Sequence, residues 1–459
     1  MKRILTLALA ILVIALIPSQ GKNPKTYFVA SECGITLDSD VYEGGGTDMT
    51  AKIQAILDKA PELGHLYFVM DGAALISNSL RVHSNTTIEC PDKSCGFFLA
   101  DGSDCSLITN ANGDALEIKD RNITLIGGTY NHNSPGQAHN RPEDNPLPNP
   151  LIVLNCPTSK VYETCVYATE FYGVENFVMK DLTIANQRTY AVNMSNWKYV
   201  RMENIHIDRR IRPDAQNQDG IHFLGPGRFL TMKNIYGNSG DDFIAVTPDE
   251  VDKKSSISDV LIDGVQLEEA DQAIRLLCCD EGTLDRVVIK NVTGTYRSYG
   301  FIINPWFDSK GGHYGNIIFD TIDLRPMKNN YDYMEPCLFK IGGSIDCLTL
   351  RNIYHHNPEY DHLLFEVGRR YGGDNLGGEL QPTDIGCLVL DGVFINEKEV
   401  SRDVYLDVTE AHIGTLFLDD IIVNRPAGKA GQGSFIKTKE GATIDKIVTG
   451  TVSVDCPLL

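Results

Sequence analysis

Two short acidic motifs carry the clearest potential for chemistry in this chain of 459 residues: Asn217-Gln218-Asp219-Gly220 and Ser239-Gly240-Asp241-Asp242. Asp219 and Asp241 are separated by 22 residues, about the length of one turn of a parallel β-helix. On such a scaffold they would lie on neighbouring turns, roughly 4.8 Å apart, and three carboxylates would share one patch. Clustered carboxylates raise one another's pKa, so one can stay protonated while another is ionised near neutral pH.

The scaffold itself is indicated by a repeat that recurs from about residue 120. Two alternating apolar positions are followed by Asn, Asp or Gly and then by an apolar, mostly β-branched residue, as in Val200–Ile205, Phe229–Ile235, Val287–Val292 and Leu348–Ile353. Aligned on their last residue, successive repeats are 23, 30, 30, 27, 30, 31, 40 and 28 residues apart. Each unit predicts a strand, a tight polar turn and a second strand, with no helical pattern long enough for a βαβ crossover. The sequence therefore predicts an all-β fold, a right-handed parallel β-helix of about ten coils.

The N-terminal part of the chain predicts a different element. After Gly44-Gly45-Gly46, Thr47-Asp48 can cap a helix that runs through Ile53, Ile56 and Leu57. Strands are then expected at Leu66–Val69 and Thr87–Ile88. A short helix at this end would cover the first coil, which would otherwise expose an unpaired strand edge.

The first residues resemble a secretory signal. Lys2 and Arg3 precede an apolar run from Ile4 to Ile17, and Pro18-Ser19-Gln20-Gly21 follows. Fourteen residues are short for a bilayer span and suit a signal core. We expect residues 1–21 to be cleaved, residues 22–459 to form a single catalytic β-helix domain, and the protein to be secreted or periplasmic, with no membrane contact after cleavage. An uncleaved anchor is the alternative.

The net charge limits the classes of partner that the protein can bind, and the cysteine content indicates which disulfides could form. The formal net charge of −20 repels polyanions, which argues against nucleic acid and mildly against highly charged acidic polymers. Twelve cysteines in an exported chain permit disulfides, with Cys90/Cys95 and Cys156/Cys165 as the nearest pairs. Cys278-Cys279 is expected to pack rather than to bind metal, because adjacent strand residues point to opposite faces. No metal pattern stands out, and we expect no cofactor.

Residues 131–165 interrupt the repeats with several prolines and asparagines. We expect a long loop on one coil. It either forms a wall of a binding cleft or is a surface insertion, and as a wall it would favour exo action.

The segment from Gly44 to Glu89, followed by the coils, resembles the opening of pectin-acting β-helix enzymes. The acidic motifs narrow this resemblance to the polygalacturonase-like glycoside hydrolases of family 28. In that family an Asn-x-Asp motif precedes a Gly-Asp-Asp motif by about one coil, and here Asn217-Gln218-Asp219 and Gly240-Asp241-Asp242 match. The resemblance covers roughly residues 30–310.

The resemblance implies a division of labour among the acids. Asp241 would be the general acid that protonates the leaving oxygen, while Asp219 and Asp242 would hold and deprotonate the attacking water, with inversion at the anomeric carbon. Inverting hydrolysis does require one protonated carboxyl and one carboxylate with room for a water. The alternative is that these aspartates are turn residues, as in the Asp-Gly pairs at 263–264 and 391–392.

Two motifs of the family are missing. Its His-Gly pair on the coil after Gly-Asp-Asp is replaced by Ala270-Asp271-Gln272, and its Arg-x-Lys pair, which grips the substrate carboxylate, by Gly300–Asn304. Galacturonate recognition of the family's usual kind is therefore not expected, and a neutral or differently charged sugar becomes an alternative.

Other polar and aromatic residues near the motifs are candidates for substrate binding: Asn217, His222, Gln272, Arg275, Asn304 and Trp306. His222 is either a proton or hydroxyl partner or a solvent-facing strand residue. Arg275 either binds a sugar or pairs with a structural carboxylate. Trp306 and Tyr299 either stack on a sugar ring or pack internally. The basic segment 209–212 either attracts an anionic sugar or balances nearby acids.

The sequence thus predicts a glycoside hydrolase acting on a polysaccharide or oligosaccharide, pectic material first. A polysaccharide lyase acting on a uronate-containing glycan and a non-catalytic carbohydrate-binding β-helix stay open. Linkage, endo or exo action and oligomeric state are not predicted.

Overall fold

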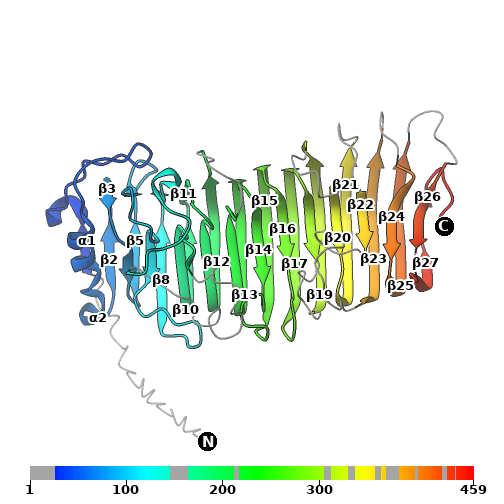
Figure 1. The fold of residues 1–459 in the computed structure, drawn as a ribbon, viewed down its shortest axis with the longest axis horizontal. Coiled ribbons are helices and arrows are strands. Elements are labelled where there is room, and N and C mark those ends of the chain that lie inside the picture. The colour runs from blue at the N-terminus through cyan, green and yellow to red at the C-terminus, as the bar shows by residue number, and fades with distance from the viewer. Residues whose placement is uncertain are drawn as a thin grey trace, which may run out of the picture.

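The chain winds into one elongated right-handed parallel β-helix, as predicted (Figure 1). The computed structural model describes residues 26–144, 164–210, 217–303, 312–328, 336–356, 363–368, 382–397, 402–425, 432–439 and 441–459. The 28 strands in this described part of the chain belong to one continuous sheet system that wraps around the long axis. The expected signal segment lies outside the described residues, and no helix within them is long and apolar enough to cross a membrane.

The helical elements whose bounds lie within the described residues are η1 (Ala30–Cys33), α1 (Thr50–Leu57), α2 (Ala60–Leu63) and η2 (Ser134–Gly136). The strands of the first coils are β1 (Thr26–Val29), β2 (Leu66–Val69), β3 (Ala73–Ile76), β4 (Leu80–Val82), β5 (Thr86–Glu89), β6 (Gly96–Leu99), β7 (Ile108–Asn110), β8 (Asp120–Ile126), β9 (Thr129–Asn131), β10 (Thr169–Lys180), β11 (Thr183–Ala185) and β12 (Val192–Asp208). The remaining strands are β13 (Ile221–Asn238), β14 (Asp242–Thr247), β15 (Ile257–Glu269), β16 (Gln272–Leu276), β17 (Thr283–Tyr296), β18 (Tyr299–Ile303), β19 (His313–Pro326), β20 (Cys337–Ile341), β21 (Ser344–His356), β22 (Leu363–Val367), β23 (Thr383–Asn396), β24 (Val404–Thr409), β25 (Ala411–Asn424), β26 (Ser434–Lys439), β27 (Thr443–Thr449) and β28 (Val452–Ser453).

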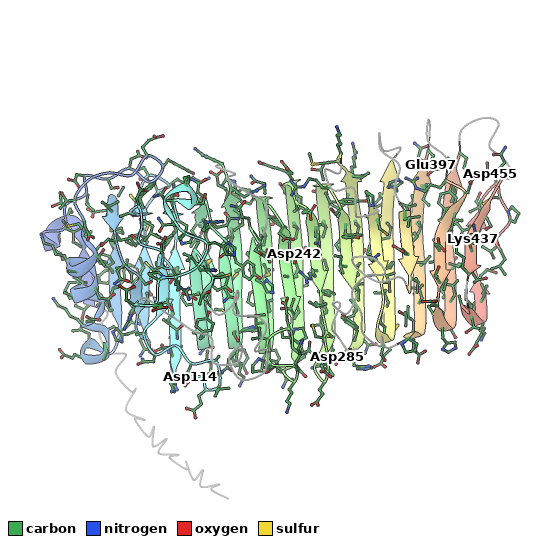
Figure 2. All side chains as sticks on the ribbon, viewed as in Figure 1. Asp114, Asp242, Asp285, Glu397, Lys437 and Asp455 are labelled. Atoms are coloured by element: carbon green, nitrogen blue, oxygen red, sulfur yellow. The ribbon has the colours of Figure 1, made fainter. Side chains whose placement is uncertain are left out.

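Parallel pairing between successive coils builds columns of strands along the axis. One column, which we call the motif sheet, consists of β4, β7, the first residues of β10, β12 and β13, and then β14, β16, β18, β20, β22, β24 and β26. Both acidic motifs run directly into strands of this sheet, near the middle of the molecule, where Asp242 is labelled in Figure 2.

The short N-terminal helix is present and covers the first coil (Figure 1). α1 buries Ile53, Ile56 and Leu57, the three residues predicted for its inner face, and contacts β2 and β4. The N-cap position is Met49, which makes no side-chain capping bond, so the prediction of a cap at Thr47-Asp48 is off by one residue. Asp48 Oδ1 still accepts a hydrogen bond of 2.9 Å from the backbone N–H of Thr50, the first residue of the helix.

The predicted repeats correspond to real coils because their turn residues share one backbone conformation. In each of the nine repeats, the residue before the last has a positive φ, between 49° and 84°: Asp181, Asn204, Asn234, Gly264, Asn291, Thr321, Asn352, Gly392 and Asp420. Asn, Asp and Gly tolerate this left-handed region better than other residues. Their side chains also bond from coil to coil, as in Asn234 Nδ2 to Asn204 Oδ1 at 3.0 Å.

The residue after each turn points into a continuous apolar core. Ile205, Ile235, Val265 and Val292 are register partners on successive coils and are all buried. The alignment of the repeats on this residue was therefore correct, and burial of these stacked aliphatic side chains supplies the main stabilisation of the solenoid.

The expected Cys90/Cys95 disulfide does not form. All cysteines in the described part of the chain are free thiols, and Cys156 lies outside it. Cys90 and Cys95 are buried in the main core, where thiols pack as small apolar groups, and burial raises the pKa of both. Cys278 and Cys279 are also buried and free, as expected of packing residues.

The described part of segment 131–165 is packed rather than loose. Asn133 Nδ2 donates to Leu99 O at 3.0 Å, and Gln137 Nε2 donates to Ala100 O at 2.9 Å. Arg141 is buried and forms an ion pair with buried Glu170 on β10. These contacts fix the beginning of the segment against the coils, while residues 145–163 lie outside the described part.

Substitution of the turn residue Asn234 tests the role of this backbone conformation. Asn234→Val should lower the free energy of unfolding by about 1–3 kcal/mol, because a β-branched residue is strained at positive φ and the bond to Asn204 is lost. Asn234→Gly loses the same bond without the strain and should cost less than Asn234→Val. Chemical denaturation measures both. Equal losses would show that the left-handed backbone is not what the turn requires.

Candidate active site

Strand register brings the two acidic motifs onto adjacent coils. β13 and β14 pair in parallel with Ile221 opposite Ile244, an offset of 23 residues. The counterpart of Asp219 on the next coil is therefore Asp242, and the expectation from spacing that Asp219 would face Asp241 is off by one residue. Because side chains alternate along a strand, this single step decides which carboxylates share a face.

Gly220 permits this close approach. The N–H of Gly220 donates to Asp242 O at 2.8 Å, and a Cβ atom on Gly220 would lie 2.3 Å from Phe243 O. No side chain fits at that distance without moving the backbone, so the glycine after Asp219 is required by the packing of the two coils.

Asp219 is held by a buried histidine. His222 Nδ1 lies 2.9 Å from Asp219 Oδ2, and the imidazole is stacked on Tyr190 with ring centroids 4.5 Å apart. On its other side His222 Nε2 lies 2.9 Å from Thr247 Oγ1 and 3.2 Å from Glu250 Oε2. His222 is 1% exposed, so it is not a solvent-facing strand residue.

Asp242 is held by a buried arginine. Arg275 Nη1 donates to Asp242 Oδ2 at 2.8 Å, and Arg275 Nη2 lies 4.0 Å from Glu250 Oε1. Arg275 thus pairs with carboxylates, as the structural alternative predicted, but these carboxylates belong to the motif itself. Asp242 Oδ1 is buried and accepts no hydrogen bond from any residue in the described part of the chain.

These contacts form a chain of alternating charges across three coils. We call it the ion-pair array, and it consists of Asp219, His222, Glu250, Arg275 and Asp242. Each cation lies between two carboxylates. Buried ion pairs are stable only when such partners compensate the loss of hydration. The array therefore fixes the orientation of Asp219 and Asp242 through their Oδ2 atoms.

Burial and neighbouring charges shift the pKa values of this array. Burial raises the pKa of Asp219 to about 7, against the lowering effect of His222 and with a further raising effect from Asp241. Burial also raises the pKa of Asp242 well above its ordinary value, and Arg275 opposes this. Burial lowers the pKa of His222, but the bonds to Asp219 and Glu250 outweigh it and raise that pKa to about 9.

Asp241 occupies a more open position than Asp242. It is only partly buried, and its Oδ2 accepts a hydrogen bond of 3.2 Å from the backbone N–H of Asn217, which has a φ of 53°. Burial raises the pKa of Asp241, while Arg275 and Arg297 oppose the shift. The structure thus places Asn217 beside Asp241 through its backbone.

A fourth aspartate, Asp271, belongs to this cluster and was missed as a candidate. The pairing of Asp242 with Gln272 on β16 places Asp271 on the coil next to Asp241, where the family histidine was sought. Asp271 Oδ1 accepts a bond of 2.7 Å from Ser298 Oγ and lies 3.6 Å from Arg297 Nε. Burial, and then the charge of Asp241, raise the pKa of Asp271 to about 6. The sequence signal that could have identified Asp271 is its position directly before a strand of the motif sheet, as in the two acidic motifs.

The basic segment 209–212 has a positioning role at its first residue. Arg209 is 2% exposed, and it donates to Gln218 Oε1 at 2.9 Å and to Ser239 O at 3.0 Å. One guanidinium therefore binds a residue of each acidic motif. Arg210 is more exposed and bonds to Asp208 Oδ2 at 2.7 Å. Neither cation supports the idea of a patch for an anionic sugar, and residues 211 and 212 lie outside the described part.

The remaining candidates divide into two groups. Gln272 is buried beside Asp242 in the strand register. Tyr299 is buried and packs with Ile302, Cys337 and Leu363, which favours the internal-packing alternative. Asn304 and Trp306 lie outside the described residues. Within the described part of Gly300–Asn304, Ile302 is the register partner of Arg275, so an apolar side chain lies where the Arg-x-Lys pair was sought.

Comparison with known proteins supports the resemblance to family 28. The family model for glycosyl hydrolases family 28 matches residues 154–254, which contain both acidic motifs. The fold is similar to that of the family 28 exopolygalacturonase of Yersinia enterocolitica, with a TM-score of 0.56, 13% identity, and coverage of 94% of this chain and 79% of that chain. No curated protein matches the sequence.

Two further solved structures show the range of proteins with this fold. The hyperthermoactive exopolygalacturonase of Thermotoga maritima matches with a TM-score of 0.50, 12% identity, and coverage of 93% of this chain and 92% of that chain. The pre-mature gene product 12 of bacteriophage phi29 matches with a TM-score of 0.53, 11% identity, and coverage of 93% and 57%. These identities show a shared β-helix fold, so the activity of this chain has to be argued from its side chains.

Arg209 and Arg210 provide a matched test of how the motifs are positioned. Arg209→Met should lower the free energy of unfolding by about 2–3 kcal/mol, because two buried acceptors lose a charged donor. Arg210→Met should cost less than about 1 kcal/mol, since that side chain is 57% exposed. Urea denaturation compares them, and equal losses would contradict a special role for Arg209.

His222 should make stability depend on pH in a defined window. Its folded pKa of about 9 exceeds the ordinary value of 6.5, so its contribution is fully present below pH 6.5 and is lost as pH rises through 9. The difference in unfolding free energy between the wild type and His222→Gln should shrink by about 2–3 kcal/mol over this range. His313→Gln is the control, because the His313 side chain is 43% exposed. A difference that stays constant with pH would refute the charged state of His222.

Proposed function

We propose that the protein is a glycoside hydrolase that cleaves a polysaccharide of pectic type by an inverting acid and base mechanism. The observation that carries this proposal is the cluster of Asp219, Asp241 and Asp242 on adjacent coils, with Asp219 and Asp242 held by buried cations. The match of residues 154–254 to the family 28 model supports it.

In this mechanism Asp241 protonates the leaving glycosidic oxygen. It is the most accessible of the three acids, and its raised pKa favours the protonated form that a general acid needs. Protonation turns the departing sugar into a neutral alcohol, which lowers the barrier to breaking the bond to the anomeric carbon.

Asp219 and Asp242 activate the water on the opposite side. His222 and Arg275 bind the Oδ2 atoms of these two residues, and Asp242 Oδ1 remains as a buried acceptor for a water proton. Since the pKa of Asp219 is raised to about 7, the pair takes up or releases a proton near neutral pH. A water bound there attacks the anomeric carbon as its proton passes to the carboxylate pair.

The side chains of this site indicate the type of reaction more closely than they indicate the sugar. A pectic glycan is proposed from the exopolygalacturonases that share the fold, while Ile302 offers no charge to a uronate. We therefore include glycans with a neutral sugar next to the scissile bond. We further propose that residues 1–21 direct secretion or export to the periplasm, where such polymers are met.

The decisive experiment is cleavage of defined pectic and neutral glycans by the wild type and Asp241→Asn. The wild type should release reducing ends, with inversion visible in the NMR signals of the first product anomer, and Asp241→Asn should lose about 100-fold or more in kcat. Asp263→Asn is the control, because Asp263 is a turn residue bonded to Asn291.

Three outcomes would contradict the proposal. Full activity of Asp241→Asn would remove the general acid. Unsaturated uronate products, detected by ultraviolet absorbance, would indicate a lyase instead. Binding of a glycan with no cleavage across the whole panel would indicate a carbohydrate-binding β-helix.

A further inference from the structure

Glu250 lies at the centre of the ion-pair array, although neither acidic motif contains it. It follows β14 in a turn, and its side chain is 16% exposed. Its Oε2 lies 3.2 Å from His222 Nε2 on the coil before, and its Oε1 lies 4.0 Å from Arg275 Nη2 on the coil after. It is the one residue in the described part of the chain that links both cations.

The backbone around Glu250 is held firmly. Asp249 Oδ1 accepts a hydrogen bond of 2.6 Å from Cys279 N, and Asp249 Oδ2 accepts from the N–H groups of Asp280 and Gly282 at 2.7 and 2.9 Å. Asp252 Oδ1 accepts two further backbone bonds of 2.9 Å, from Lys254 and Ser255. The turn is thus anchored to the next coil, and the position of Glu250 is set by the scaffold.

We propose that Glu250 is a positioning residue for the hydrolytic reaction: it holds His222 and Arg275 so that these cations orient Asp219 and Asp242 toward the attacking water. This inference rests on the proposed function. Glu250 touches neither carboxylate in any contact within the described residues, so it acts through the two cations.

The position between His222 and Arg275 requires an anionic side chain. His222 and Arg275 are buried cations on the coils before and after Glu250, and they would repel each other if no anion lay between them. Glu250 is faced by His222 from β13, Arg275 from β16, Thr247 from β14 and the thiol of Cys279. Burial opposes its charge, but His222 and Arg275 lower its pKa to about 2, so it is ionised at any working pH.

The test is Glu250→Gln, which removes the charge and keeps the shape. Removing a negative charge lowers the pKa of Asp219 and Asp242, so the low-pH limb of kcat should move to lower pH. Looser orientation should reduce kcat by up to about 100-fold with KM unchanged. Glu268→Gln, an exposed surface change, is the control and should match the wild type.

A second readout does not depend on activity. NMR titration of the His222 imidazole should give a pKa near 9 in the wild type and a lower pKa in Glu250→Gln, because one of its two carboxylate partners is lost. The unfolding midpoint, measured alongside, identifies any loss of folding. If the wild type cleaved no glycan, the proposed hydrolase function would fail while this titration still tested the array.

Three results would overturn the role of Glu250. The first is an active Glu250→Gln with unchanged kcat and an unmoved pH limb. The second is a change in KM alone, which would make Glu250 a substrate ligand. The third is an unchanged His222 titration, which would show that the two groups do not interact.

Discussion

Parallel hydrogen bonding between successive coils is the constraint on which the rest of this molecule depends. It fixes the offset of 23 residues between β13 and β14, and this offset decides that Asp242 is the counterpart of Asp219. Gly220 allows the two backbones to approach closely, and Arg209 links the two acidic motifs by donating to Gln218 and to Ser239. The geometry of the carboxylates is therefore a property of the coil register, with side-chain contacts refining it.

Charge neutralisation is the second requirement, since five carboxylates gather around the motifs: Asp219, Asp241, Asp242, Glu250 and Asp271. His222, Arg275 and Arg297 lie among them, and each contacts at least one of these acids. Burial raises the pKa of all four aspartates, and neighbouring carboxylates add to this shift at Asp219, Asp242 and Asp271, whereas His222 and Arg275 lower the pKa of Glu250. The protein thus holds both forms of the same functional group within one patch.

Much of the fold could be predicted because it repeats. The alternation of apolar residues and the Asn, Asp or Gly before each restart report directly on burial and on the left-handed turn. The position of the two acidic motifs on adjacent coils could be predicted from the same repeat length. Glu250 and Asp271 could not be assigned in this way, because their partners are on other coils and the direction of a side chain is not visible in local spacing. The one-residue error in the register has the same origin, because the offset between β13 and β14 is set by pairing between coils.

The stacked left-handed turns have a consequence for how such a protein changes over time. Each turn closes its own corner and bonds mainly to the equivalent turns above and below it, as Asn234 does with Asn204. Repeats from 23 to 40 residues long are accommodated in one column, because the strands on either side keep their parallel register. A change in the length between two strands therefore leaves the register of the motif sheet unchanged, and the relative position of Asp219 and Asp242 is inherited with the column.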